Sequence, residues 1–119
     1  MAITALYERT NVTVGATEYS IAGDTTGSPP AVAITTDGVY QLWIDDQTNM
    51  TKTEEYRIKI KETCRASGTQ RLIFSATIKG VQSEMFCTPM LILMNGWDMT
   101  IQKIAGTDRA FDASIRQIS

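Results

Sequence analysis

The amino-acid sequence predicts an all-β protein, folded as an antiparallel β-sandwich or barrel of about 8–10 short strands with little or no helix. Apolar and polar residues alternate over many short stretches, and no segment spaces its apolar residues as a helix requires. Turn-forming residues interrupt these stretches about every 8–12 residues, which is typical of such folds. We expect residues 1–119 to form a single domain with a substantial core.

The first part of the chain contains short predicted strands and two segments suited to contacts with other chains. Residues 3–7, 11–14 and 17–21 show the alternation of half-buried strands. We also expect that residues 1–15 can act as an arm that reaches another molecule. Residues 23–30 are rich in Gly, Ser, Thr and Pro, which predicts an exposed loop.

Three further strands are predicted in the middle of the chain. Residues 31–34 and 39–44 are separated by Asp37-Gly38, a dipeptide typical of tight hairpins. Residues 39–44 are apolar on both faces, as expected of a central strand or one covered by another layer. Residues 56–61 alternate strictly, so we expect one face to point inward and the other to solvent or to an acidic partner. The inward residues are Tyr56, Ile58 and Ile60, and the outward residues are Arg57, Lys59 and Lys61.

The C-terminal part of the chain has the clearest pattern. Residues 72–78 form a predicted strand that is apolar on both faces. Residues 90–94 are a continuous apolar run, the dipeptide Asn95-Gly96 favours a tight turn, and residues 97–104 alternate. Together these three segments predict a β-hairpin. A last strand follows at the C-terminus.

The chain lacks the residue patterns of common catalytic and cofactor sites. It has no histidine, which excludes the Ser-His and Cys-His nucleophile pairs and most zinc sites. It also has no glycine-rich phosphate-binding loop. Asp45, Asp46, Glu54 and Glu55 flank one loop, but their spacing is not that of an EF-hand. We therefore expect a protein that is not an enzyme and holds no cofactor or metal.

Composition and charge narrow the range of partners and compartments. The net charge is −2, so the basic excess of a nucleic-acid-binding protein is absent. No apolar run approaches the ~18 residues of a membrane span, and the N-terminus does not resemble a signal peptide. We therefore expect synthesis in the cytoplasm and no membrane partner. Cys64 and Cys87 are expected as small core residues, although their spacing leaves a disulfide open.

Several strands carry more apolar residues than one sandwich can bury. Residues 39–44, 72–78 and 90–94 are apolar on both faces, and the chain has six methionines, a residue suited to adaptable interfaces. We infer that part of this surplus meets another subunit, so that the protein forms homo-oligomers. A closed barrel or a covered sheet within one chain is the alternative. The predicted interface residues are Trp43, Met90, Leu91, Leu93, Met94, Trp97 and Met99.

Two stretches of the sequence add a resemblance to a known group of proteins. Residues 96–109 and 114–116, together with residues 36–43, resemble small structural proteins of tailed bacteriophages. The resemblance implies a β-rich virion component without catalytic residues. Its most direct form is a capsid decoration (cement) protein that binds capsid subunits, self-associates and acts by multivalency. A head–tail or tail protein of the same virion is the alternative.

A further alternative comes from the residues of the chain themselves. A β-sandwich module that binds calcium or a carbohydrate would place its site near Trp43, Asp45 and Asp46. Aromatic and carboxylate side chains are the groups such a site needs.

Overall fold

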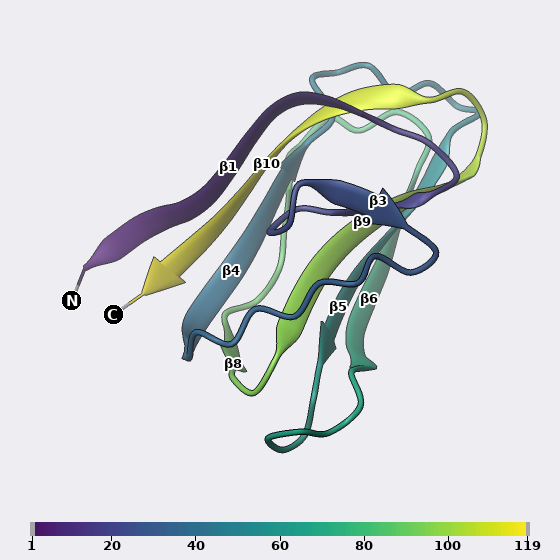
Figure 1. The fold of residues 1–119 in the computed structure, drawn as a ribbon. Helices are drawn as coiled ribbons and strands as arrows, with labels where there is room; N and C mark the ends of the chain where they lie inside the picture. Colours follow the sequence, from purple (N-terminus) through teal and green to yellow (C-terminus); the bar gives the residue numbers. More distant parts are fainter. Residues whose placement is uncertain (1, 119) are drawn as a thin grey trace.

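The computed structural model describes residues 2–118, which form two antiparallel β-sheets and no helix (Figure 1). The prediction of an all-β fold is confirmed. The fold is an open sandwich of two sheets and not a closed barrel.

Each sheet contains five strands. Sheet A has the order β1-β10-β4-β7, and β8 also pairs with β4. Its strands are β1 (Ile3–Val14), β10 (Arg109–Ile118), β4 (Gly38–Asp45), β7 (Phe86–Cys87) and β8 (Leu91–Leu93). Sheet B has the order β3-β2-β9-β5-β6. Its strands are β3 (Thr25–Gly27), β2 (Glu18–Ser20), β9 (Trp97–Ala105), β5 (Glu55–Glu62) and β6 (Arg71–Lys79).

Strands β7 and β8 form one interrupted edge strand beside β4. Between them, the backbone N–H of Thr88 donates to the carbonyl of Leu42, at 3.0 Å. The Thr88 hydroxyl in turn accepts a hydrogen bond from the Leu42 N–H, at 3.0 Å. Pro89, which has no N–H to donate, follows at the break. The side chain of Thr88 thus replaces a backbone partner and keeps the edge attached.

The strand order is that of a jelly roll. If β7 and β8 count as one strand, sheet A is ordered β1-β10-β4-β7/β8 and faces β2-β9-β5-β6, with β3 added at the edge of sheet B. Most connections pass from one sheet to the other, as in the double Greek key of an eight-stranded jelly roll. Consecutive strands pair directly only in the hairpins β2–β3 and β5–β6.

The core lies between the sheets, and aromatic rings join the two layers. The rings of Tyr40 and Trp97 lie 4.5 Å apart, and those of Tyr56 and Phe111 lie 4.7 Å apart. Tyr56 also receives a hydrogen bond from the Arg109 N–H, at 2.7 Å. The predicted inward face of residues 56–61 is confirmed, because Tyr56, Ile58 and Ile60 are fully buried.

The predicted hairpin at Asn95-Gly96 is wrong. Both residues have positive φ angles, 66° and 105°, as a tight turn requires. However, β8 before the turn belongs to sheet A, and β9 after it belongs to sheet B. The turn therefore crosses between layers, and it is held by Thr63, whose N–H donates to the Gly96 carbonyl at 3.0 Å.

The dipeptide Asp37-Gly38 also fails to form the predicted hairpin. Residues 31–34 are not a strand, although Ile34 forms a single antiparallel bridge with Trp97 in sheet B. Gly38 begins β4 in sheet A, so this turn also connects the two layers.

The N-terminal segments are more ordered than the sequence suggests. Residues 3–14 form one long edge strand, β1, which pairs with β10 through two irregularities in register. Most of the segment proposed as an arm therefore lies within sheet A; residues 2 and 15 flank the strand, and residue 1 is outside the described residues. The predicted loop at 23–30 is largely exposed but contains the short strand β3.

Candidate interaction surface

The outer face of sheet B, which we call the closed face, carries charged side chains that pair with one another. Lys61 of β5 forms an ion pair with Glu18 of β2 at 2.6 Å, and Lys59 lies 3.7 Å from the same carboxylate. The Thr100 hydroxyl of β9 also donates to Glu18. Glu18 is only 5% exposed, so this ion pair lies largely out of water. Glu18 is thus an acidic partner for Lys59 and Lys61 within the same chain, whereas Arg57 of the basic row is exposed.

A second carboxylate on the same face is buried without full compensation. Asp98 of β9 is 1% exposed, and its Oδ1 accepts hydrogen bonds from the Ser20 hydroxyl at 2.6 Å and the Met99 N–H at 2.8 Å. Its Oδ2 has no partner among the described residues. Burial raises the pKa of Asp98 to about 6, and these two hydrogen bonds offset the effect only in part.

Burial also acts on Glu18, but with the opposite net result. Burial alone would raise the pKa of this carboxyl group. The hydrogen bonds from Lys61 and Thr100 and the charges of both lysines outweigh it and lower the pKa below its ordinary value. Glu18 is therefore held as a carboxylate inside a network that serves the fold.

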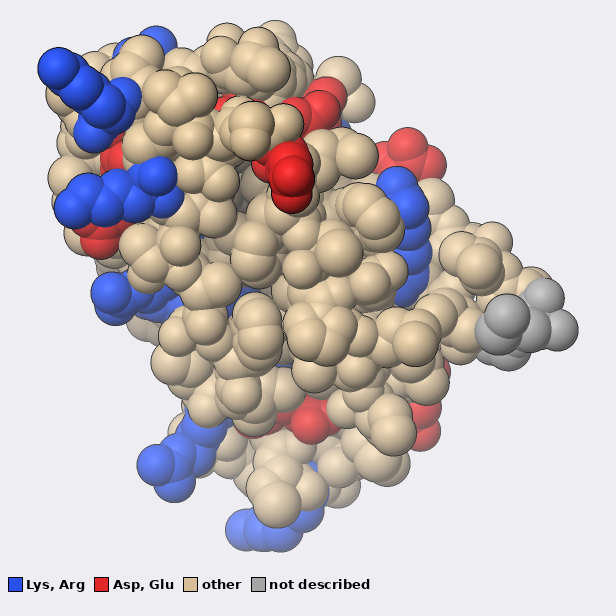
Figure 2. Space-filling view, turned by 180° about the vertical axis from the view of Figure 1, so that it is seen from behind, with Lys and Arg blue, Asp and Glu red and all other residues tan. Residues whose placement is uncertain are grey.

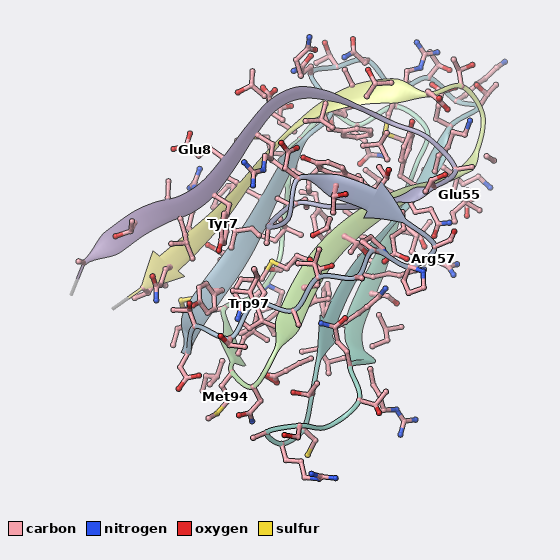
Figure 3. The ribbon with its side chains drawn as sticks, viewed as in Figure 1. Tyr7, Glu8, Glu55, Arg57, Met94 and Trp97 are labelled. Atoms are coloured by element: carbon pink, nitrogen blue, oxygen red, sulfur yellow. The ribbon has the colours of Figure 1, made fainter. Side chains whose placement is uncertain are left out.

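The outer face of sheet A is open. Along β4 the outward residues alternate with the buried Tyr40, Leu42 and Ile44. The strand register aligns one apolar row across four strands, which we call the apolar row and which consists of Ile3, Ile118, Val39 and Ile92. Further along the same strands, the register aligns Glu8, Ser114, Trp43 and Cys87. Figure 3 shows Glu8 pointing away from the molecule on β1 and Tyr7 pointing to the other side of that strand.

Exposed apolar side chains concentrate at the edges formed by β6, β7 and β8. Nine large hydrophobic side chains are exposed in the described residues, and seven of them lie between positions 72 and 94. We call these seven the apolar flank: Leu72, Ile73, Val81, Met85, Met90, Ile92 and Met94. Both strand edges here are open, because β6 pairs only with β5, and β7 and β8 pair only with β4. An unpaired edge with exposed apolar side chains is a surface prone to pair with another chain.

The apolar flank is bordered by a hollow. A hollow of about 480 Å³ lies beside Leu72 and Ile73 at the end of the β5–β6 hairpin. The nearby Met94 N–H donates to the Glu62 carboxylate at 2.7 Å, which brings β8 close to that hairpin. Figure 2 views the molecule from behind Figure 1, and the centre of that face carries few charged side chains, with Lys and Arg near its margins.

The predicted interface residues separate into two groups. Leu93, Trp97 and Met99 are fully buried between the sheets, so they belong to the core and offer no surface to a partner. Figure 3 shows Trp97 inside the sandwich and Met94 next to the turn at the lower end of the sandwich. Met90 and Met94 are exposed, while Trp43 and Leu91 are half-buried. Five further exposed residues were not among the predicted interface residues, although residues 72–78 and 90–94 were predicted to be apolar on both faces: Leu72, Ile73, Val81, Met85 and Ile92.

The acidic residues that the sequence analysis considered do not form a metal site among the described residues. Glu54 is fully buried, and hydrogen bonds from Thr53, Thr51 and Arg109 lower its pKa to about 2. Asp45 lies on the open face of sheet A, whereas Asp46 is buried. Within residues 2–118, no group of three or more Cys, Asp or Glu side chains is arranged to hold a metal ion.

The two cysteines differ from their prediction. Cys64 and Cys87 are both exposed and free, and neither is a core residue. Cys87 follows the half-buried Phe86 in β7, so alternation along the strand turns its side chain outward. Because residues 2–118 contain no helix, none of them forms a helix long and apolar enough to cross a membrane.

A hollow of about 210 Å³ opens on the outer face of sheet A beside Trp43. We call it the tryptophan hollow, and its lining includes Glu8, Trp43, Asp45, Asp112, Ser114 and Arg116. Arg9 and Thr10 also line it, but the Arg9 guanidinium donates to the carbonyls of Ile21 and Ala22 at 2.8 and 2.9 Å. Met85 of the apolar flank stands at its border, so the two surfaces adjoin. Trp43 and Asp45 were both considered for a ligand site in the sequence, but Asp46 does not line this hollow.

Comparisons with known proteins give no relative from which a function can be transferred. No model of a protein family matches this chain, and no curated protein or solved structure is significantly similar to it.

Proposed function

We propose that this protein is a non-enzymatic structural component of a virion, and that it acts as a capsid decoration protein which binds capsid subunits and self-associates. The single observation that carries the proposal is the apolar flank along two open strand edges. A protein that works through such surfaces needs no catalytic group, and many weak copies on a regular shell gain strength by multivalency.

The fold gives this proposal independent but general support. Jelly rolls are common in viral capsid proteins, and they also occur in lectins and cupins. A fold alone does not define a function. The resemblance of residues 36–43 and 96–109 to tailed-phage structural proteins points in the same direction. A head–tail or tail protein would use the same flank against a different subunit.

Charge reversal on the apolar flank would test the proposal. Ile73 on β6 and Ile92 on β8 are 50% and 77% exposed, so replacing both with Glu should leave the fold intact. We expect the wild-type protein to form defined oligomers in analytical ultracentrifugation and to sediment with empty capsids of the virus that encodes it. The Ile73→Glu/Ile92→Glu variant should lose both properties, because a desolvated charge at an apolar interface is unfavourable.

Ile104→Glu is the matched control. Ile104 is a comparably exposed apolar residue, at 45%, but it lies on β9 outside the flank. This variant should behave as the wild type in both measurements. A wild-type protein that stays monomeric and binds neither capsid nor tail particles would refute the proposal.

A further inference from the structure

The tryptophan hollow is built from side chains that are already held in place. The Trp43 indole N–H donates to the Gln41 side-chain oxygen at 3.0 Å. The guanidinium carbon of Arg116 lies over the Trp43 ring, 4.3 Å from its centroid. This cation–π contact and the hydrogen bond fix the ring on the open face of the sheet. A ligand would therefore meet an aromatic surface whose orientation is already set.

The strand register places the acidic groups of the hollow on the other side of the ring. Arg116 is paired with Gln41, Ser114 with Trp43, and Asp112 with Asp45 in successive outward positions. Arg116 therefore approaches Trp43 from the Gln41 side. Along the strands, Asp45 and Asp112 therefore lie on the opposite side of Trp43 from Arg116, and all four residues line the same hollow.

The two aspartates are oriented by donors that occupy only one oxygen of each. Gln47 donates its backbone N–H to Asp45 Oδ1 at 2.9 Å and its side-chain amide to Asp112 Oδ1 at 2.6 Å. The Asn11 N–H also donates to Asp112 Oδ1, at 2.8 Å. Like charges directly opposite in a sheet are unfavourable, so this pair is stabilised by its donors. The second oxygen of each carboxylate remains free for a ligand as far as residues 2–118 are concerned.

The chemistry of the lining selects one class of ligand. Asp45, Asp112 and Glu8 accept hydrogen bonds, whereas Ser114 and Arg116 can donate them. Three carboxylates disfavour an anion, and a simple metal ion would leave the donors Ser114 and Arg116 unused. A ligand with adjacent hydroxyl groups, which both donate and accept, and with an apolar C–H face would match all three features.

We infer that the tryptophan hollow binds one ring of a saccharide, stacked on Trp43 and bound through its hydroxyl groups to Asp45 and Asp112. The volume of about 210 Å³ lies below the ~300–1,000 Å³ typical of sites for drug-sized ligands, which suits a single ring. This inference does not depend on the proposed virion function. The ligand surface and the apolar flank meet only at Met85.

Nuclear magnetic resonance can test the inference with an internal control. The chain contains two tryptophans, and therefore two indole N–H signals. Trp43 lines the hollow, whereas Trp97 is fully buried and donates its indole N–H to the Thr36 carbonyl at 3.1 Å. The full-length ¹⁵N-labelled protein would be titrated with the methyl glycosides of glucose, galactose, mannose and N-acetylglucosamine. The variant Trp43→Phe assigns the two signals.

We expect at least one glycoside to shift the Trp43 signal in a saturable way while the Trp97 signal stays in place. Asp112→Asn removes a charged acceptor and should weaken that binding about tenfold. Met90→Ala on the apolar flank, away from the hollow, should bind as the wild type does. The folded state of each variant would be checked from the dispersion of its amide spectrum.

Three outcomes would overturn the inference. The first is the absence of a Trp43 shift with all four glycosides, together with no binding to an array of immobilised oligosaccharides. The second is an equal shift of both indole signals, which would indicate a nonspecific effect. The third is a Trp43 shift with ethylguanidinium but with no saccharide, which would assign the hollow to a basic side chain of a protein partner.

Discussion

The outer faces of the two sheets differ in how their side chains are satisfied. On sheet B, Glu18 pairs with two lysines and Asp98 is buried beside Ser20, so charged groups lie almost out of water. On sheet A, an apolar row and the tryptophan hollow face solvent. Polar residues on the closed face thus serve the fold, whereas Ile3 and Ile92 on the open face remain exposed. Where a residue lies in the fold is therefore more informative about its role than its chemical type alone.

The same comparison separates two kinds of ionisable group. The closed face contains carboxylates with shifted pKa values, a property often associated with active sites. Here the shifts arise from burial and from ion pairs within the sheet. On the open face, the described residues donate hydrogen bonds to only one oxygen of Asp45 and of Asp112, and a hollow lies beside these carboxylates. Space for a ligand, rather than a shifted pKa, distinguishes the candidate site.

We expect the largest effect on stability when the ion network on the closed face is lost. Glu18→Gln leaves Lys59 and Lys61 partly buried without a carboxylate, which should lower the free energy of unfolding by about 3 kcal/mol. Urea denaturation would measure this change. Glu55→Gln is the matched control, because Glu55 pairs at 4.0 Å with the exposed Lys79, and it should lower stability by less than about 1 kcal/mol. Equal effects of the two substitutions would remove the distinction between the faces.

A smaller effect of opposite sign is expected at Asp98. Asp98→Asn keeps an acceptor for Ser20 and Met99 but removes a buried charge, so it should raise the free energy of unfolding at pH 7 by about 2 kcal/mol. The wild-type pKa is about 6 in the folded state, compared with an ordinary value of 3.8. The unfolded chain therefore releases this proton at lower pH than the folded chain does.

The pH dependence gives the control for this prediction. The contribution of Asp98 to the free energy of unfolding is fully present below pH ~4. It falls as the pH rises toward ~6 and is absent above that pH. The lowered pKa of Glu18 acts in the opposite direction at more acidic pH, where its contribution is lost as the pH falls. Denaturation of Asp98→Asn between pH 4 and 6 should show a smaller decline with pH than the wild type. An unchanged slope would contradict the assignment.

The smallest effect on stability is expected on the open face. Ile92 is 77% exposed and contacts little of its own chain, so Ile92→Thr should change the free energy of unfolding by less than about 0.5 kcal/mol. Thermal unfolding at low protein concentration would measure it. A loss above about 2 kcal/mol would show that the apolar row stabilises the single chain and is not a free surface.

The sequence allowed the strands to be predicted better than the way they are arranged. Alternation along residues 56–61 identified the buried face of β5, because the period of two is a local property. Asn95 and Gly96 form the predicted tight turn with positive φ angles, but these angles do not decide whether the next strand pairs with the previous one. That choice depends on distant strands, since β9 pairs with β2 and β5 and leaves β8 to pair with β4.

The surface was predicted only in part for the same reason. The apolar run at residues 90–94 indicated surplus hydrophobic side chains, and Met90 and Met94 are indeed exposed. Leu93 belongs to the same run and Trp97 follows the next turn, but both are buried. Leu93 faces the other sheet, and the Trp97 ring packs against Tyr40. The tryptophan hollow joins residues from β1, β4 and β10, which are far apart in the sequence, so only the paired sheet brings them together.

Because β1 pairs with β10, the order of the strands along the chain can be changed without changing their arrangement in space. Ile3 is the partner of Ile118, so the outer ends of these two strands leave the molecule at the same corner (Figure 1). A short linker could join them, and a new opening in residues 63–70 would leave all strand pairs in place. Such a circular permutant would present the open face of sheet A unchanged while its chain ends emerged beside the apolar flank.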